Sequence, residues 1–225
     1  MSQVADDLSV AWYQACDLIR SRLPGLAANH SVWLLPSLES ALFEVSQVLV
    51  DRNAEMGGAK NKALFVRGQD PSFEVLASAL SSSGLDTRFC SMDEFRTPAT
   101  SFDPIKSEAL FVAYAANSRF TGEVFDLTAP RAHILASGSK AALLRVGFEQ
   151  KFDETVKPEP WEISINVLWS GASVVVLGER FRVSPKTALY QMPRGLIENV
   201  VREFMDVSSG VAVKSFATGG AGLGS

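Results

Sequence analysis

The sequence predicts an α/β fold of three layers, in which a mainly parallel sheet is flanked by helices. Short apolar runs alternate with amphipathic segments along the chain, which is typical of strands and helices that follow one another in turn. The apolar runs show no regular exchange of apolar and polar residues, as expected for strands that helices cover on both faces. Glycine and proline separate the segments, as at Pro24-Gly25 and Gly57-Gly58.

The first half of the chain predicts three helices and three strands. Apolar residues recur at helical spacing over residues 8–23, and Ser37 is suited to cap a second helix that extends to about residue 53. The strands are expected at residues 31–35, 63–67 and 87–90, with the third helix at residues 72–82.

The second half predicts four more strands and one helix. The strands are expected at residues 109–114, 132–136, 163–168 and 172–177, and an amphipathic helix at residues 194–205. We expect residues 1–192 to form one large domain and residues 193–213 a C-terminal helix with an extension. The glycine-rich residues 214–225 are expected to form a flexible tail.

Composition excludes several classes of protein. The 225 residues carry a net charge of -4, so no broad basic field is available to hold a nucleic acid. Cys16, Cys90 and two histidines lack the spacing of a zinc site or a disulfide framework. No apolar run is long enough to span a membrane, and the N-terminus lacks the pattern of a signal peptide. We therefore expect a cytoplasmic protein.

Two segments carry residues suited to a ligand site. Ser37, Glu39 and Ser40 follow a strand and open a helix, whose N-terminus can bind an anion such as a phosphate. Asn117 follows another strand and leads into a turn with Thr121-Gly122-Glu123. The same residues have structural interpretations, because Ser37 and Glu39 can cap a helix and Gly122 can serve a tight turn.

Together with residues 63–89 and 172–190, these segments resemble the large domain of fold-type I pyridoxal-phosphate enzymes, most closely the class V aminotransferase and cysteine desulfurase branch. The resemblance spans roughly residues 8–192. It implies that the Ser37 helix cradles the cofactor phosphate and that Asn117 reaches the phenolic oxygen of the ring. It also implies a dimer, either a homodimer or a heterodimer with a related protein.

The same resemblance shows three departures from the family pattern. Arg180 stands where the Schiff-base lysine is expected, and a guanidinium is not a nucleophile at neutral pH. Ala136 or Ser137 stands where an acid should pair with the pyridine nitrogen, and the glycines of the phosphate cradle are missing. The leading hypothesis is therefore a degenerate, non-catalytic protein that binds no cofactor and acts in binding or assembly.

Two alternatives remain open from the residues alone. Lys186 or Lys140 could form the Schiff base with pyridoxal phosphate in an active enzyme of rearranged site, although each can equally be a surface lysine. Alternatively, Ser37 and Arg180 could bind another small anion or a phosphorylated metabolite, unless Arg180 is a surface residue paired with a neighbour.

Overall fold

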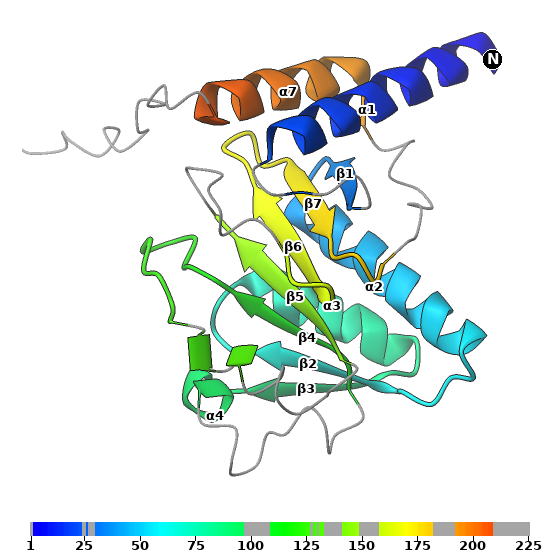
Figure 1. Ribbon diagram of the computed structural model, residues 1–225. Helices are drawn as coiled ribbons and strands as arrows, with labels where there is room; N and C mark the ends of the chain where they lie inside the picture. The colour runs from blue at the N-terminus through cyan, green and yellow to red at the C-terminus, as the bar shows by residue number, and fades with distance from the viewer. Residues whose placement is uncertain are drawn as a thin grey trace, which may run out of the picture.

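One seven-stranded sheet organises the part of the chain that the computed structural model describes, which is residues 2–23, 26, 30–96, 109–126, 128–129, 131–132, 141–148, 158–181 and 192–208. Its strands lie in the order β1-β7-β6-β5-β4-β2-β3 (Figure 1). Their bounds are β1 Ser31–Leu35, β2 Lys62–Val66, β3 Asp86–Cys90, β4 Ala109–Ala115, β5 Ala142–Gly147, β6 Glu162–Val167 and β7 Ser173–Leu177.

Strand direction decides which residues meet at each edge of the sheet. β2 pairs in parallel with β3 and with β4, and the parallel arrangement continues through β5 to β6. β7 is antiparallel to both β6 and β1. The carboxyl ends of β1 to β6 therefore lie along one edge, here called the carboxyl edge, together with the amino end of β7.

Helices cover the sheet on both faces, as predicted. α2 (Leu38–Glu55) and α3 (Pro71–Ser82) pack on one face, within the larger hydrophobic core. α4 (Met92–Arg96) packs on the opposite face, where Phe95 joins a second core with Val112 and Tyr114. α1 (Ser2–Arg22) and α7 (Arg194–Ser208) lie side by side near β1 and β7 (Figure 1).

α1 protects the outer edge of β1. The indole Nε1 of Trp12 donates a hydrogen bond of 3.0 Å to the carbonyl oxygen of Leu34. Burial raises the pKa of the neighbouring Cys16 thiol far above its usual value. α7 contributes Val200 and Phe204 to the same core, so the C-terminal helix packs with the residues of the large domain.

One predicted strand is largely untested, and one strand of the sheet was not predicted. The sequence predicted residues 132–136, but residues 131 and 132 are helical, residues 133–136 fall outside the described residues, and the strand after β4 is β5. Arg145 interrupts the apolar run of β5, so the hydrophobic pattern did not indicate a buried strand there. In the structure the Arg145 side chain is buried and donates to the Ser164 hydroxyl on β6, at 3.3 Å.

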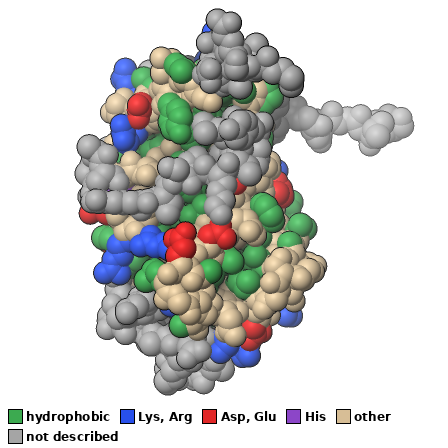
Figure 2. All heavy atoms as spheres, turned by 90° about the vertical axis from the view of Figure 1, so that its right-hand side faces the viewer, with side chains coloured by type: hydrophobic (Ala, Val, Ile, Leu, Met, Phe, Trp, Pro, Cys, Tyr) green, Lys and Arg blue, Asp and Glu red, His purple; other side chains and the backbone are tan. Residues whose placement is uncertain are grey.

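The surface carries charges of both signs. On the face in Figure 2, acidic and basic side chains are interspersed with hydrophobic ones over the described residues. Among the described helices, none combines the length and apolar character needed to cross a membrane.

Candidate functional site

The carboxyl edge gathers four of the eight predicted site residues, together with Gln69 and Asp70. Ser37 follows β1, Gln69 and Asp70 follow β2, and Asn117 follows β4. This is the edge at which open parallel sheets bind their ligands, because loops there diverge and helix N-termini point toward it. The structure thus brings Ser37, Glu39, Ser40 and Asn117 to one edge.

Ser37 acts as the N-cap of α2. Its φ of -154° is extended, and its hydroxyl oxygen accepts a hydrogen bond of 3.1 Å from the backbone N–H of Ser40. The hydroxyls of Ser37 and Ser40 are also within hydrogen-bonding distance, at 3.3 Å. The structure therefore confirms that Ser37 caps α2, and its hydroxyl already has hydrogen-bonding partners within the protein.

Glu39 lies in the first turn of α2 and bridges to α3. Its Oε1 accepts a hydrogen bond of 2.9 Å from the hydroxyl of Ser72. Partial burial tends to raise the pKa of Glu39, but its own backbone N–H, the Ser37 and Ser72 hydroxyls and the charge of Arg119 hold it below the usual value. The Glu39 carboxylate thus supplies a negative charge at the α2 N-terminus.

Gln69 fastens the β2–α3 turn to β4. Its Nε2 donates to the Ala115 carbonyl oxygen at 3.1 Å, and its Oε1 accepts from the Ala115 N–H at 2.7 Å. Gln69 is buried, so this two-way bond satisfies backbone groups that water cannot reach. No sequence pattern indicates this role, because any polar residue after a strand could have faced solvent.

Asn117 joins the ends of β4 and β5. Its Nδ2 donates to the Phe148 carbonyl oxygen at 2.9 Å, and its Oδ1 accepts from the Phe148 N–H at 2.8 Å. Both ends of the amide are therefore engaged with backbone. The following turn is closed by Gly122, which has a φ of 70° and donates its N–H to the Ser118 carbonyl oxygen at 3.0 Å.

Arg180 lies at the opposite edge of the sheet, which corrects the grouping expected from the sequence. Its backbone N–H donates to the Pro160 carbonyl oxygen at 3.0 Å, just before β6 begins. Its own carbonyl oxygen accepts from Arg52, near the end of α2, at 2.6 Å. Because β7 runs against its neighbours, the residues after β7 lie far from Ser37 and Asn117.

The remaining predicted site residues fall outside the described residues: Ser137, Lys140 and Lys186. The only lysines within the described residues, Lys60 and Lys62, lie before and at the amino end of β2, opposite the carboxyl edge. β5 and the residue after it, residues 142–148, contain no acidic side chain. Since β5 is the strand that follows β4, this is where the family pattern would place the acid that pairs with the pyridine nitrogen.

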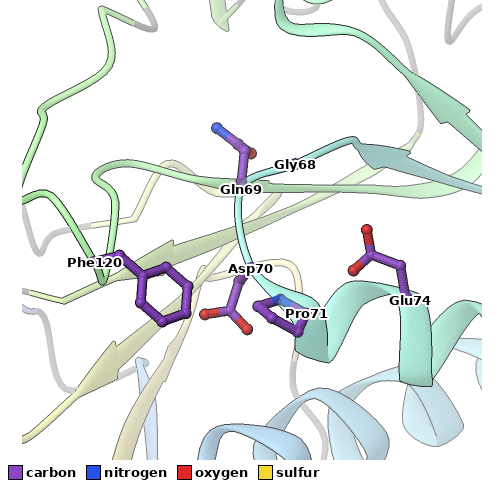
Figure 3. Close-up of a pocket in the computed structure, with 6 residues that line it drawn as sticks. All are labelled: Gly68, Gln69, Asp70, Pro71, Glu74 and Phe120. Carbon is purple, nitrogen blue, oxygen red and sulfur yellow. The ribbon is translucent and has the colours of Figure 1, made fainter.

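A pocket of about 270 Å³ opens at the carboxyl edge, between the β2–α3 turn and the turn after β4. It is lined by Gly68, Gln69, Asp70, Pro71, Glu74 and Phe120. Figure 3 shows the Asp70 carboxylate between the Phe120 ring and Pro71, with Glu74 further along α3. Asp70 was not among the predicted site residues, although its place before Pro71 is a recognisable helix-start signal.

Neither a metal centre nor a reactive thiol is supported by the described residues. They contain no group of three or more His, Cys, Asp or Glu side chains placed to hold a metal ion. Cys90 ends β3 near the carboxyl edge, but burial, together with the charge of Glu94, raises the pKa of its thiol to about 12. A thiol with that pKa is almost fully protonated near neutral pH and is a poor nucleophile.

Comparisons with known proteins place this architecture. No family model and no curated protein matches the sequence. Solved structures do match, including a NifS-like protein at a TM-score of 0.62 and 8% identity, over 90% of this chain and 60% of that one. Others are a sphingosine-1-phosphate lyase from Burkholderia pseudomallei (TM-score 0.59, 12% identity, 92% and 55% covered) and a glutamate decarboxylase from Lactobacillus brevis (0.57, 12%, 91% and 60%).

The matches define the fold class. The protein is an α/β domain with a mostly parallel sheet. More particularly, it has the fold of the large domain of fold-type I pyridoxal-phosphate enzymes, as the resemblance predicted. The chain spans 55 to 60% of the length of the three structures described above.

Proposed function

We propose that this protein is a degenerate, non-catalytic relative of the fold-type I pyridoxal-phosphate enzymes, in which the sheet is kept for binding or assembly. The observation that carries the proposal is the position of Glu39. Its carboxylate faces hydrogen-bond donors at the N-terminus of α2, where the resemblance implies the cofactor phosphate. A phosphate bound there would meet a like charge and would have to displace Glu39 from those donors.

The other described residues at this edge also do not fit pyridoxal phosphate. Both ends of the Asn117 amide bond to Phe148, which holds the amide against the end of β5 and leaves one hydrogen of Nδ2 for any ring oxygen. No described lysine lies at the carboxyl edge, and residues 142–148 supply no carboxylate for a pyridine nitrogen. The lysine and the carboxylate that the described residues lack at this edge, together with Glu39, concern separate parts of the cofactor, which is why we favour a binding role over a rearranged active site.

The test is to mix the purified protein with pyridoxal phosphate and record the visible spectrum before and after borohydride. We expect no aldimine band and no pyridoxyl label by mass analysis of peptides. A band that borohydride removes, with the label on one lysine such as Lys140 or Lys186, would overturn the proposal and show an active-site lysine. Bovine serum albumin at equal concentration controls for nonspecific labelling of surface lysines.

Assembly into a dimer is part of the same proposal. Phe120, Val124 and Trp169 are large apolar side chains that lie exposed in loops along the carboxyl edge. Apolar side chains of this size are enriched where subunits meet. Light scattering should give twice the 24.3 kDa of one chain, or a monomer that becomes a heterodimer with a related protein. A monomer that binds no such relative would contradict it.

A further inference from the structure

The pocket beside α3 is acidic and holds a carboxylate oxygen without a partner. Asp70 is only 2% exposed. Its Oδ1 accepts the Ser72 N–H at 2.9 Å and thereby caps α3, but its Oδ2 has no hydrogen-bond partner among the described residues. Burying a carboxylate oxygen without a hydrogen-bond donor costs free energy. A ligand that supplies a donor there removes this cost, and the free energy recovered favours its binding.

The other walls of the pocket favour a positive charge on an apolar stem. Glu74, exposed on the first turns of α3, adds a second carboxylate, and no described arginine or lysine lines the pocket. Phe120 offers an exposed ring beside Asp70 (Figure 3). Aromatic rings attract cations, and they also pack against methylene groups.

The nearest arginines along the chain are turned elsewhere. The guanidinium of Arg67 lies over the Phe89 ring, 5.6 Å from its centroid. That of Arg119 lies over the Phe148 ring at 5.8 Å and acts on Glu39. Neither guanidinium is therefore placed on the two pocket carboxylates.

The geometry points to a binding site for a primary alkylammonium group, with the ammonium on Asp70, the alkyl stem along Phe120 and Glu74 as a further negative charge in the wall of the pocket. A compact ammonium suits this site better than a guanidinium, because only one Asp70 oxygen is unpaired and a bidentate pair needs two. A volume of about 270 Å³ accommodates a short alkylamine or the side chain of a lysine. The inference deepens the proposed binding role and rests on it.

The experiment is a titration of the ¹⁵N-labelled chain with n-butylammonium chloride in the absence of pyridoxal phosphate, followed by backbone amide shifts. We expect saturable shifts at Gly68, Gln69, Asp70, Ser72 and Phe120, while n-butanol, the neutral compound of the same length, produces none there. Equal shifts from butanol, or shifts confined to other residues, would overturn the inference.

A charge-removing variant tests whether the Asp70 carboxylate binds the amine. Asp70→Asn keeps a good N-cap for α3, so the fold should persist, while affinity for butylammonium falls by about tenfold or more. Glu55→Gln removes the same charge at the other end of α2 and should leave affinity unchanged. Unchanged affinity in Asp70→Asn would refute the site.

The source of the amine follows from a second ligand. Tighter binding of Nα-acetyl-lysine amide than of butylammonium would indicate a lysine side chain on a protein partner, and the reverse order a small free amine. Either order supports the site. Because no pyridoxal phosphate is present, failure here leaves the result of the borohydride test untouched, and an aldimine in that test would not by itself produce amine binding at Asp70.

Discussion

The hydroxyl of Ser72 on α3 donates a 2.9 Å hydrogen bond to the carboxylate of Glu39 on α2. The two residues belong to the first turns of helices whose preceding strands, β1 and β2, are separated by four other strands in the sheet. One carboxylate therefore connects two helix starts at the carboxyl edge, and its charge is favourable at both N-termini. The negative charge at these helix N-termini is thus supplied by a side chain of the protein itself.

Glu39→Gln should lower stability at neutral pH and not in acid. Because the pKa of Glu39 is lowered in the folded protein, its contribution is present above the unfolded pKa of about 4.3 and is lost as pH falls through the folded pKa. The side chain is largely exposed, so we expect less than about 1 kcal/mol at pH 7. Urea unfolding at pH 7 and pH 3 measures the unfolding free energy of Glu39→Gln relative to wild type. A loss of the same size at both pH values would contradict a charge effect. Glu55→Gln is the control.

Gln69→Leu should be strongly destabilising. The substitution keeps an apolar stem but leaves the buried N–H and carbonyl of Ala115 without the partners that Gln69 provides. Two unsatisfied backbone groups cost about 2–4 kcal/mol in unfolding free energy. Gln14→Leu, on the exposed surface of α1, should change it by less than about 0.5 kcal/mol. Equal effects of the two substitutions in urea unfolding would show that the Gln69 bonds contribute nothing.

Gly122→Ala and Gly195→Ala should change the stability of the protein in opposite directions. An added Cβ meets nothing within 4 Å at either position, so sterics with neighbours do not decide the outcome. Gly122 has a φ of 70°, where alanine costs about 1 kcal/mol, whereas Gly195 lies in α7 without a positive φ, where alanine stabilises by about 0.4–1 kcal/mol. Thermal unfolding of both variants measures this, and a stabilised Gly122→Ala would mean that the turn adopts another conformation.

Much of the fold could be predicted because its signals are local. The Ser37 cap and β1 are where the sequence indicated, since a serine before an apolar helical stripe and a short apolar run need no tertiary information. β5 was missed because Arg145 is charged, and its burial depends on partners on other strands, such as Ser164 on β6.

The misplacement of Arg180 has a different cause, because its position depends on strand direction. The strands predicted at residues 163–168 and 172–177 leave only three residues between them, too few for a parallel crossover. That spacing already required β7 to be antiparallel and Arg180 to lie opposite the carboxyl edge. The contacts of Gln69 and Asn117 could not be foreseen, since they join residues distant in sequence through backbone groups that no pattern reports.

Tyr114→Phe should destabilise the protein at pH 8 and less so at pH 11. The Tyr114 hydroxyl is fully buried and donates to Glu162 Oε1 at 2.6 Å, while Arg131 contacts the other oxygen of Glu162 at 2.7 Å. Removing a hydrogen bond to a buried charge costs about 2 kcal/mol. Burial first, and then the Glu162 charge, raises the pKa of Tyr114 well above 10. Its contribution is therefore complete below the unfolded pKa of about 10 and declines as pH rises toward the folded pKa.

Urea unfolding at the two pH values measures the gap in unfolding free energy between wild type and Tyr114→Phe, which should narrow at pH 11. Tyr13→Phe, which changes an exposed ring on α1, should show little gap at either pH. A gap that stays constant to pH 11 would mean that the hydroxyl does not titrate differently in the folded and unfolded states.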